Sequence, residues 1–332
     1  MSDSEKGGFS FASKPKQGEP WDVAIVGSGP SGLTAAIYTT RGAASTIIFA
    51  GERWGGQLML TTTIDNYPAL PSVQGPDLMQ KMKDHALSFG AEFIQKNVEN
   101  IELGKAPFEL TVAGQRFLAK SVIVATGADT KWLGVPGEKE LIGRGVSSCA
   151  PCDAPFFKQK NVMVVGGGDS AMEEAMVLTK YAILVTIVHR RGEFRASAAM
   201  QAKVSAEEKN GKIKIIWDSE ITQFIGRDKL DRVTVKNIKD GKEREVAIDG
   251  VFVAIGHVPS TKIFQGKLAL DEKGYIKKVP IDTFQMSTSI PGVFVAGDVH
   301  DYHYRQAITA AGFGCQAGMD ALVFLDKPTP SW

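Results

Sequence analysis

The stretch DVAIVGSGPSG, residues 22–32, decides the fold of this chain, because an apolar strand-like run passes directly into a glycine-rich turn. A helix-like segment follows at residues 33–41, and a second apolar run occupies residues 45–50. This order of strand, G-x-G-x-x-G turn, helix and strand is typical of a βαβ unit that binds a dinucleotide. Glycine is needed in the turn because backbone N–H groups at the helix N-terminus must touch a pyrophosphate.

The same order occurs a second time, much further along the chain. The apolar run NVMVV, residues 161–165, leads into GGGDSA, residues 166–171, followed by a helix-like segment at 172–180 and a strand-like one at 183–188. One such fingerprint is weak evidence, since incidental glycine turns are common. Two of them, each between a strand and a helix, predict two dinucleotide-binding units.

Three further apolar segments, residues 121–128, 250–256 and 292–298, read as buried strands and indicate how the two units share the chain. We predict an α/β fold with two Rossmann-like, three-layer nucleotide-binding domains, the second inserted into the first. The first domain would comprise residues 21–133 and 258–332, and the inserted domain residues 134–257. Residues 1–20 lack the apolar core of a signal peptide and are predicted to be a disordered extension.

Composition excludes several classes of protein. The 332 residues are 43% hydrophobic and 23% charged, with a net charge of +1. This balance argues against a nucleic-acid partner, and the absence of a run of about 18 apolar residues argues against a membrane span. Three cysteines are too few for a disulfide framework, which favours a reducing, cytoplasmic location.

The residues after each second strand predict which nucleotide binds where. An acidic residue at this position usually holds the ribose of NAD, whereas arginines accept the 2′-phosphate of NADP. The inserted domain has His189, Arg190, Arg191 and Arg195 there, which predicts NADPH, although a solvated basic turn is the alternative. The first unit is then predicted to hold FAD, with Glu52 as a possible ribose ligand.

The pair Cys149 and Cys152, followed by Asp153, carries the redox chemistry in this reading. A zinc site would need a second pair of ligands, so no metal is expected. Cysteines at the start of a helix have lowered thiolate pKa values, which suits disulfide exchange. Asp153 would exchange a proton with the thiols or, alternatively, cap the helix. Cys315 is expected near a helix start and is given no role.

Taken together, these motifs resemble those of the low-molecular-weight, NADPH-dependent thioredoxin reductases over about residues 21–326. The resemblance rests on GSGPSG (27–32), GGQL (55–58), DNYP (65–68), ATGA (125–128), C-x-x-C-D (149–153), GGGDSAMEEA (166–175), HRRxxFRAS (189–197), AIGHxP (254–259) and GDVxDxxYRQAI (297–308). The chain departs from the usual pattern at Ala150-Pro151, between the cysteines, and at Ala154-Pro155 after Asp153.

The resemblance implies a binding residue set for each cofactor. FAD would be bound by Gly27, Ser28, Gly29, Pro30, Ser31, Gly32, Glu52, Gly55, Gly56, Gln57, Leu58, Asn66, Val98, Thr126, Gly127, Asp298, Arg305, Gln306 and Ala307. NADPH would be bound by Gly166, Gly168, Asp169, Ser170, Ala171, His189, Arg190, Arg191, Arg195, Ile255 and Gly256.

It also implies a homodimeric enzyme that transfers electrons from NADPH through FAD and the cysteine pair to thioredoxin. Cys152 would face the flavin, Cys149 would attack the substrate disulfide, and Asp153 would serve as the acid. Two alternatives stay open: a related enzyme that acts on another dithiol or a small-molecule disulfide, and a redox-sensing flavoprotein.

Overall fold

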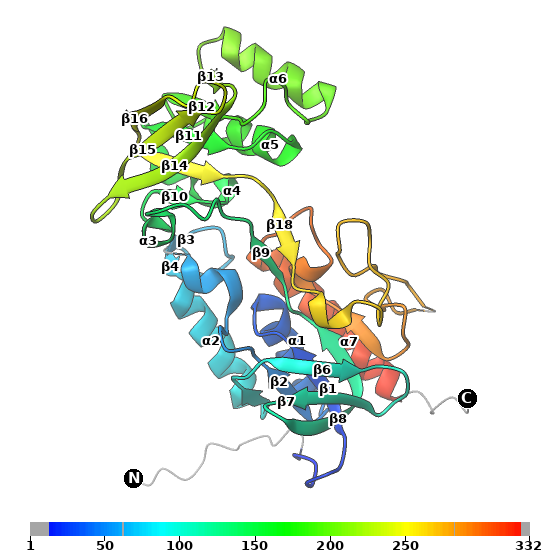
Figure 1. Cartoon of the computed structure of the whole chain (residues 1–332). Helices are drawn as coiled ribbons and strands as arrows, with labels where there is room; N and C mark the ends of the chain where they lie inside the picture. The colour runs from blue at the N-terminus through cyan, green and yellow to red at the C-terminus, as the bar shows by residue number, and fades with distance from the viewer. Residues whose placement is uncertain (1–12, 62, 282, 327–332) are drawn as a thin grey trace, which may run out of the picture. The chain divides into compact units, whose positions relative to one another are not determined.

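The computed structural model describes residues 13–61, 63–281 and 283–326, and the chain divides into two compact units. The first unit comprises Met1–Asp129 and Pro259–Trp332, and the second comprises Thr130–Val258. Where the chain crosses, β9 (Ala128–Thr130) pairs with β18 (His257–Pro259) in a two-stranded sheet (Figure 1). The first crossing thus lies a few residues before the position that the sequence suggests.

A seven-stranded sheet forms the centre of the first unit. Its order is β5 (Glu92–Ile94), β2 (Thr46–Phe49), β1 (Trp21–Val26), β8 (Gln115–Val124), β7 (Phe108–Val112) and β6 (Val98–Glu102), with β19 (Val293–Val295) also paired to β8. Strands β5, β2, β1, β8 and β19 are parallel, whereas β6, β7 and β8 form an antiparallel meander.

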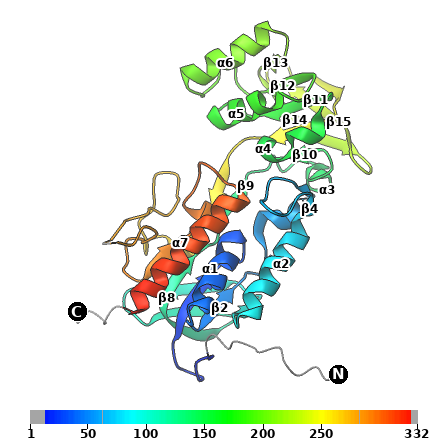
Figure 2. The ribbon, with the colours of Figure 1, turned by 180° about the vertical axis from the view of Figure 1, so that it is seen from behind.

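Three helices cover one face of this sheet, namely α1 (Pro30–Arg41), α2 (Gly75–Ser88) and α7 (Ala307–Asp326), as Figure 2 shows. Alternation along β1 explains the layering. Val23 and Ile25 are buried with Leu33 of α1, while Ala24 and Val26 are buried on the opposite face with residues of the meander. The sheet is therefore buried on both faces, as a parallel sheet usually is.

The second unit has three layers around a parallel five-stranded sheet. Its order is β10 (Val146–Ser147), β17 (Gly250–Val253), β11 (Asn161–Val165), β12 (Leu184–Val188) and β13 (Ile213–Ile216). Helices α5 (Asp169–Leu178) and α6 (Ala198–Lys209) pack on one face. A separate antiparallel sheet of β14 (Ser219–Gly226), β15 (Leu230–Asn237) and β16 (Glu243–Ala247) packs on the other. The predicted α/β fold with two Rossmann-like units is confirmed.

The remaining elements are short. They are η1 (Gly56–Leu60), β3 (Thr63–Ile64), β4 (Val73–Gln74), α3 (Glu138–Leu141), α4 (Ala150–Asp153), η2 (Ala154–Phe157), η3 (Lys262–Phe264) and η4 (Gly297–Val299). Residues 1–12 of the predicted disordered extension lie outside the described residues. Residues 13–20 are described, with a turn at 17–19, and Lys14 pairs with Glu92.

Helix α7 differs from the expectation at Cys315. The cysteine lies in the middle of the helix, not near a helix start, because the glycines around it are helical. Small buried residues of α7, among them Gly314 and Ala317, pack against α1 in the first unit. Among the described residues, α7 alone has the length and apolar composition that a membrane-crossing helix would need. The same properties are found in core helices of soluble proteins.

Candidate active site

The glycine turn at residues 27–32 joins β1 to α1 and forms one wall of a pocket in the first unit. Helix α1 begins with Pro30 at its first position, where a missing N–H costs no hydrogen bond. A Cβ atom on Gly32 would lie 2.2 Å from the carbonyl oxygen of Gly27, so only glycine lets the turn close. The turn therefore presents the N-terminus of a 12-residue helix to the pocket.

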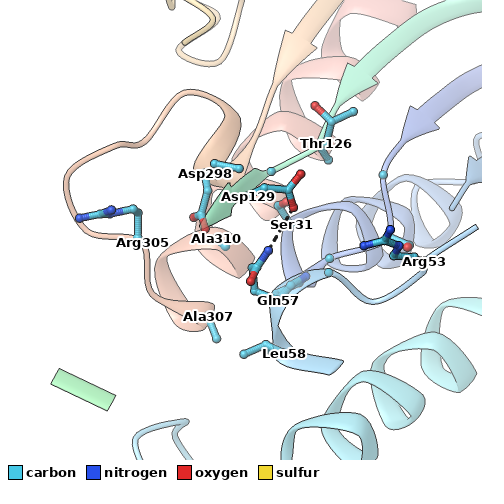
Figure 3. Close-up of a pocket in the computed structure, with 18 of the residues that line it drawn as sticks. Ser31, Arg53, Gln57, Leu58, Thr126, Asp129, Asp298, Arg305, Ala307 and Ala310 are labelled. Atoms are coloured by element: carbon cyan, nitrogen blue, oxygen red, sulfur yellow. Dashed lines mark hydrogen bonds between the residues drawn. The ribbon is translucent and has the colours of Figure 1, made fainter. Parts of the chain in front are cut away.

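Residues from four separate stretches of sequence line this pocket (Figure 3). Those that the sequence analysis named are Gly27, Ser28, Gly29, Pro30, Ser31, Gly56, Gln57, Leu58, Thr126, Gly127, Asp298, Arg305, Gln306 and Ala307. Those that it missed are Ala50, Arg53, Ala125, Ala128, Asp129 and Ala310. Asp129 could have been found because it directly follows the ATGA motif, and its Oδ1 accepts a hydrogen bond from Gln57 Nε2 at 3.2 Å.

Five of the named residues lie elsewhere. Val98, the first residue of β6, is buried in a hydrophobic cluster with residues of β1, β2 and β7 and is not among the residues that line the pocket. Gly32 supports the turn from within α1. The remaining three contribute polar contacts: the Glu52 amide donates to Asn97 Oδ1, the Gly55 amide donates to Ser28 Oγ, and Asn66 Nδ2 donates to Gln306 Oε1.

Asp298, in η4 shortly after the strand β19, supplies a half-buried carboxyl to the pocket. Burial raises the pKa of Asp298 to about 7, and the negative charge of Asp301 adds to this effect while Arg305 opposes it. A ligand that donates a hydrogen bond would stabilise the ionised form. The Asp301 carboxylate accepts the backbone N–H groups of residues 303, 304 and 305, which shapes the loop leading to Arg305.

His300 lies between these two carboxyl groups in the sequence and is buried against α7. Its ring meets Phe313 edge-on with centroids 4.6 Å apart, and its Nε2 atom is buried without a hydrogen-bond partner. Burial lowers the pKa of His300 to about 4, with a smaller contribution from the positive charge of Lys278. The imidazole is therefore neutral at physiological pH.

In the second unit, the turn at residues 166–171 joins β11 to α5 in the same way. The loop after β12 is attached to this turn by two hydrogen bonds. The Arg195 amide donates to Gly167 O at 2.7 Å, and the Ser197 amide donates to Asp169 Oδ1 at 2.8 Å. Arg190, Arg191 and Arg195 are exposed on this loop, beside the start of α5. Ile255 and Gly256 follow the end of β17, and Ile255 is also exposed.

His189 occupies a different position from the three arginines. Its ring is only 5% exposed and lies beneath Gly167, where Phe194 and Trp217 pack around it. One ring nitrogen pairs with the carbonyl oxygen of Glu193 at 3.0 Å. Desolvation lowers the pKa of His189. The histidine thus supports the turn and the arginine loop from below, a placement that the sequence motif alone does not reveal.

Cys149 and Cys152 form a disulfide in the second unit, with Cα atoms 5.3 Å apart. Helix α4, which begins after Cys149, has only four residues. The lowering of the thiol pKa by a helix N-terminus therefore stays a prediction, and it rests on a single helical turn. Asp153 does not cap the helix start; its Oδ2 atom accepts the hydroxyl of Ser147 at 2.5 Å.

Two further residues contact this motif and were missed by the sequence analysis. Ser147 lies two residues before Cys149, and its hydroxyl oxygen accepts the Cys149 amide at 3.1 Å. Glu174 of α5 accepts the amide of Ala150 through its carboxylate. Ser147 lies in the segment GVSSC and Glu174 in the segment SAMEE. Nothing in the sequence of either segment indicates that these side chains contact the cysteine motif.

Comparison with known proteins identifies the family. Residues 21–314 match the family described as pyridine nucleotide-disulphide oxidoreductase. A thioredoxin reductase of Rickettsia typhi is 46% identical over 310 residues, covering 92% of this chain and 98% of that protein. The structure of a thioredoxin reductase from Giardia duodenalis superimposes with a TM-score of 0.87 at 42% identity, over 93% of this chain and 100% of that one.

A thioredoxin reductase from Streptococcus pyogenes is also similar, with a TM-score of 0.86 at 40% identity over 92% of this chain and 98% of that one. These likenesses extend through both nucleotide units and the cysteine pair. The chain therefore belongs to the pyridine nucleotide-disulphide oxidoreductases and, within them, to the low-molecular-weight thioredoxin reductases.

Proposed function

We propose that the protein is a thioredoxin-disulfide reductase that uses NADPH, FAD and the Cys149–Cys152 pair. The observation that carries this proposal is the Cys149–Cys152 disulfide, formed in the same unit as the second glycine turn. Relatives that are 45–47% identical over about nine-tenths of the chain are named thioredoxin reductases. A C-x-x-C disulfide is suited to exchange with a dithiol protein.

Family membership implies FAD and NADPH as the cofactors. The pocket of the first unit fits FAD, because the α1 N-terminus suits a pyrophosphate and the Asp298 carboxyl can accept a hydrogen bond from a hydroxyl group. The second unit fits NADPH, because exposed guanidinium groups beside a helix N-terminus bind phosphate oxygens. When bound, FAD takes a hydride from NADPH and supplies two electrons to a disulfide.

The cysteines would then carry out two exchange steps. Asp153 takes the proton of the Cys149 thiol, and the thiolate attacks the substrate disulfide. A mixed disulfide forms as the substrate sulfur–sulfur bond breaks, and the leaving sulfur takes its proton from Asp153. The Cys152 thiolate next attacks Cys149 Sγ, which restores the Cys149–Cys152 disulfide and releases the second substrate sulfur as a thiolate that takes a proton from solvent. Two electrons pass to the substrate in each cycle.

The test is NADPH consumption by the FAD-loaded enzyme with oxidised thioredoxin, compared with Cys149→Ser and Cys152→Ser. Both variants are expected to lose thioredoxin turnover, while NADPH continues to reduce their flavin, because hydride transfer does not use sulfur. Turnover retained by either variant would contradict the dithiol mechanism. Wild-type turnover with a small disulfide alone would indicate a related enzyme with another substrate. Flavin reduction without turnover on any disulfide would indicate a redox sensor.

We also propose a homodimer that buries the outer face of α7. Ile308, Met319 and Val323 are exposed apolar residues on this helix, with exposed fractions of 43%, 54% and 48%. Tyr38 of α1 is exposed as well and interacts with Cys315 of α7. Sedimentation of the holoenzyme should give about twice the 35.7 kDa of one chain, and Met319→Glu should shift it toward the monomer. A wild-type mass of one chain at all concentrations would contradict the dimer.

Finally, we propose that the protein is cytoplasmic and acts without a membrane or a nucleic acid. Among the described residues, the only disulfide is the reactive pair, and Cys315 is a free thiol. This usage suits a reducing compartment. Fractionation of cells that produce the protein, with antibody detection, would test the location.

A further inference from the structure

A short hydrogen-bond chain connects the first cysteine of the pair to the acid. The Cys149 amide donates to Ser147 Oγ at 3.1 Å, and the Ser147 hydroxyl donates to Asp153 Oδ2 at 2.5 Å. Ser147 is 8% exposed, so water competes little for its hydroxyl. The side chain of Ser147 thus links the carboxyl of Asp153 to the backbone of Cys149.

The position of Ser147 is set by the sheet of the second unit. It is the last residue of β10, which pairs in parallel with β17 so that Ser147 lies opposite Phe252. Phe252 is fully buried in the core between the sheet and α5. A hydroxyl carried by a paired strand holds its direction better than one carried by a loop.

The backbone amides of the C-x-x-C-D segment already bind oxygen acceptors in the oxidised protein. The Cys152 and Asp153 amides both donate to the carbonyl oxygen of Cys149, and the Ala150 amide donates to Glu174. Pro151 has no amide hydrogen. Because these amides already donate to oxygen atoms, we assign proton transfer to and from the sulfur atoms to a side chain and not to the backbone of the segment.

We propose that Ser147 is a positioning residue for Asp153 in the exchange step. The proposal rests on the proposed function, in which Asp153 takes the proton of the Cys149 thiol and returns it to the leaving sulfur of the substrate. The hydroxyl of Ser147 orients the carboxyl by holding Oδ2 and does not itself touch the substrate. Loss of the hydroxyl leaves the acid in the chain but removes the hydrogen bond that holds its Oδ2 atom.

The first experiment compares Ser147→Ala with Ser147→Thr, which keeps the hydroxyl, and with Ser148→Ala as the matched control. Ser148 is a neighbouring serine whose hydroxyl pairs with Thr130 instead. Ser147→Ala should lower kcat with thioredoxin about tenfold, a part of the roughly 10²–10⁴-fold that a general acid–base group contributes. Its KM for thioredoxin and its rate of flavin reduction by NADPH should stay within twofold of wild type.

Ser147→Thr should recover most of kcat, and Ser148→Ala should behave as wild type. Failure of the threonine variant to recover activity, with normal FAD content, would overturn the proposal. A rise in KM with kcat unchanged would also overturn it, because that result indicates a docking defect.

The second experiment is a double-mutant cycle with Asp153→Asn. If Ser147 acts through Asp153, then Ser147→Ala should change kcat by less than about twofold in the Asp153→Asn background. Equal losses in both backgrounds would show that the serine acts through the Cys149 amide or through folding, and would overturn the proposal.

The same cycle measured with the small disulfide DTNB on NADPH-reduced enzyme separates this proposal from the proposed function. Coupling between Ser147 and Asp153 with DTNB, but no turnover of thioredoxin, would refute the substrate and support the positioning role. Full DTNB activity in Asp153→Asn would refute the role of Asp153 in deprotonating Cys149 and, with it, the positioning role of Ser147 in that step, since the leaving group of DTNB departs as a thiolate and needs no acid.

Discussion

Replacing Asp298 by asparagine should change how the stability of the FAD-free protein depends on pH. Burial raises the pKa of this carboxyl from 3.8 to about 7, and the charge of Asp301 contributes in the same direction. The pKa of this carboxyl is higher in the folded protein than in the unfolded chain. Its contribution to stability is therefore complete only at a pH below the pKa of the unfolded chain, and it is lost as the pH rises through the pKa of the folded protein. The relevant window therefore runs from about pH 4 to pH 8.

The magnitude follows from the size of the shift. Each pKa unit corresponds to about 1.4 kcal/mol, so ionised Asp298 destabilises the FAD-free fold by up to about 4 kcal/mol at the alkaline end. The asparagine side chain of the variant cannot ionise, so the variant should lack this loss. The free energy of unfolding of the variant relative to wild type should therefore rise steadily across the window. Bound FAD should reduce the difference, because a hydrogen-bond donor stabilises the ionised carboxylate.

The assay is urea unfolding of the FAD-free proteins at a series of pH values, followed by tryptophan fluorescence. Asp129→Asn is the matched control, since this carboxyl lines the same pocket but is exposed and loses little hydration. The control should keep the pH dependence of wild type. An Asp298→Asn variant with the same pH dependence as wild type would refute the argument that burial of this group opposes its ionisation.

Three further outcomes are expected from other parts of the molecule. Replacing Arg190 and Arg191 by alanine should raise KM for NADPH at least tenfold and change KM for NADH little, since each charge-assisted contact contributes about 1.5–3 kcal/mol; an unchanged NADPH/NADH ratio would show that these groups are merely solvated. His300→Met should stabilise the protein by about 1 kcal/mol at neutral pH, because it removes a buried nitrogen that has no hydrogen-bond partner. The stabilisation should grow below pH 6.5, because the unfolded histidine gains a proton there and the folded one, with a pKa of about 4, does not. A variant that is less stable than wild type across pH 4–8 would contradict this. Gly32→Ala should lose most bound FAD, because the added Cβ atom would lie 2.2 Å from a backbone oxygen of the turn. The control Gly104→Ala should keep the FAD content of wild type, because its added Cβ atom would meet no atom within 4 Å. Equal FAD content in the two variants would contradict the packing argument.

The sequence by itself determined both nucleotide units and the cysteine pair. Each βαβ unit is a local pattern, in which an apolar strand, a glycine turn and a helix follow one another within about 30 residues. Such patterns can be read because the backbone geometry of a glycine turn and the periodicity of strands act over short distances. The arginines after β12 and the spacing of Cys149 and Cys152 could be read for the same reason.

Only the tertiary structure decided how the side chains around these motifs are used. Val98 lies in the core and does not line the pocket, and His189 is buried beneath the glycine turn, whereas the arginines of the same loop are exposed. Ser147 meets Asp153, and Glu174 meets Ala150, although 24 residues separate the second pair. The raised pKa of Asp298 also depends on burial by residues far away in the sequence. Burial and hydrogen-bond partners arise from packing between distant segments, so no local pattern in the chain can specify them.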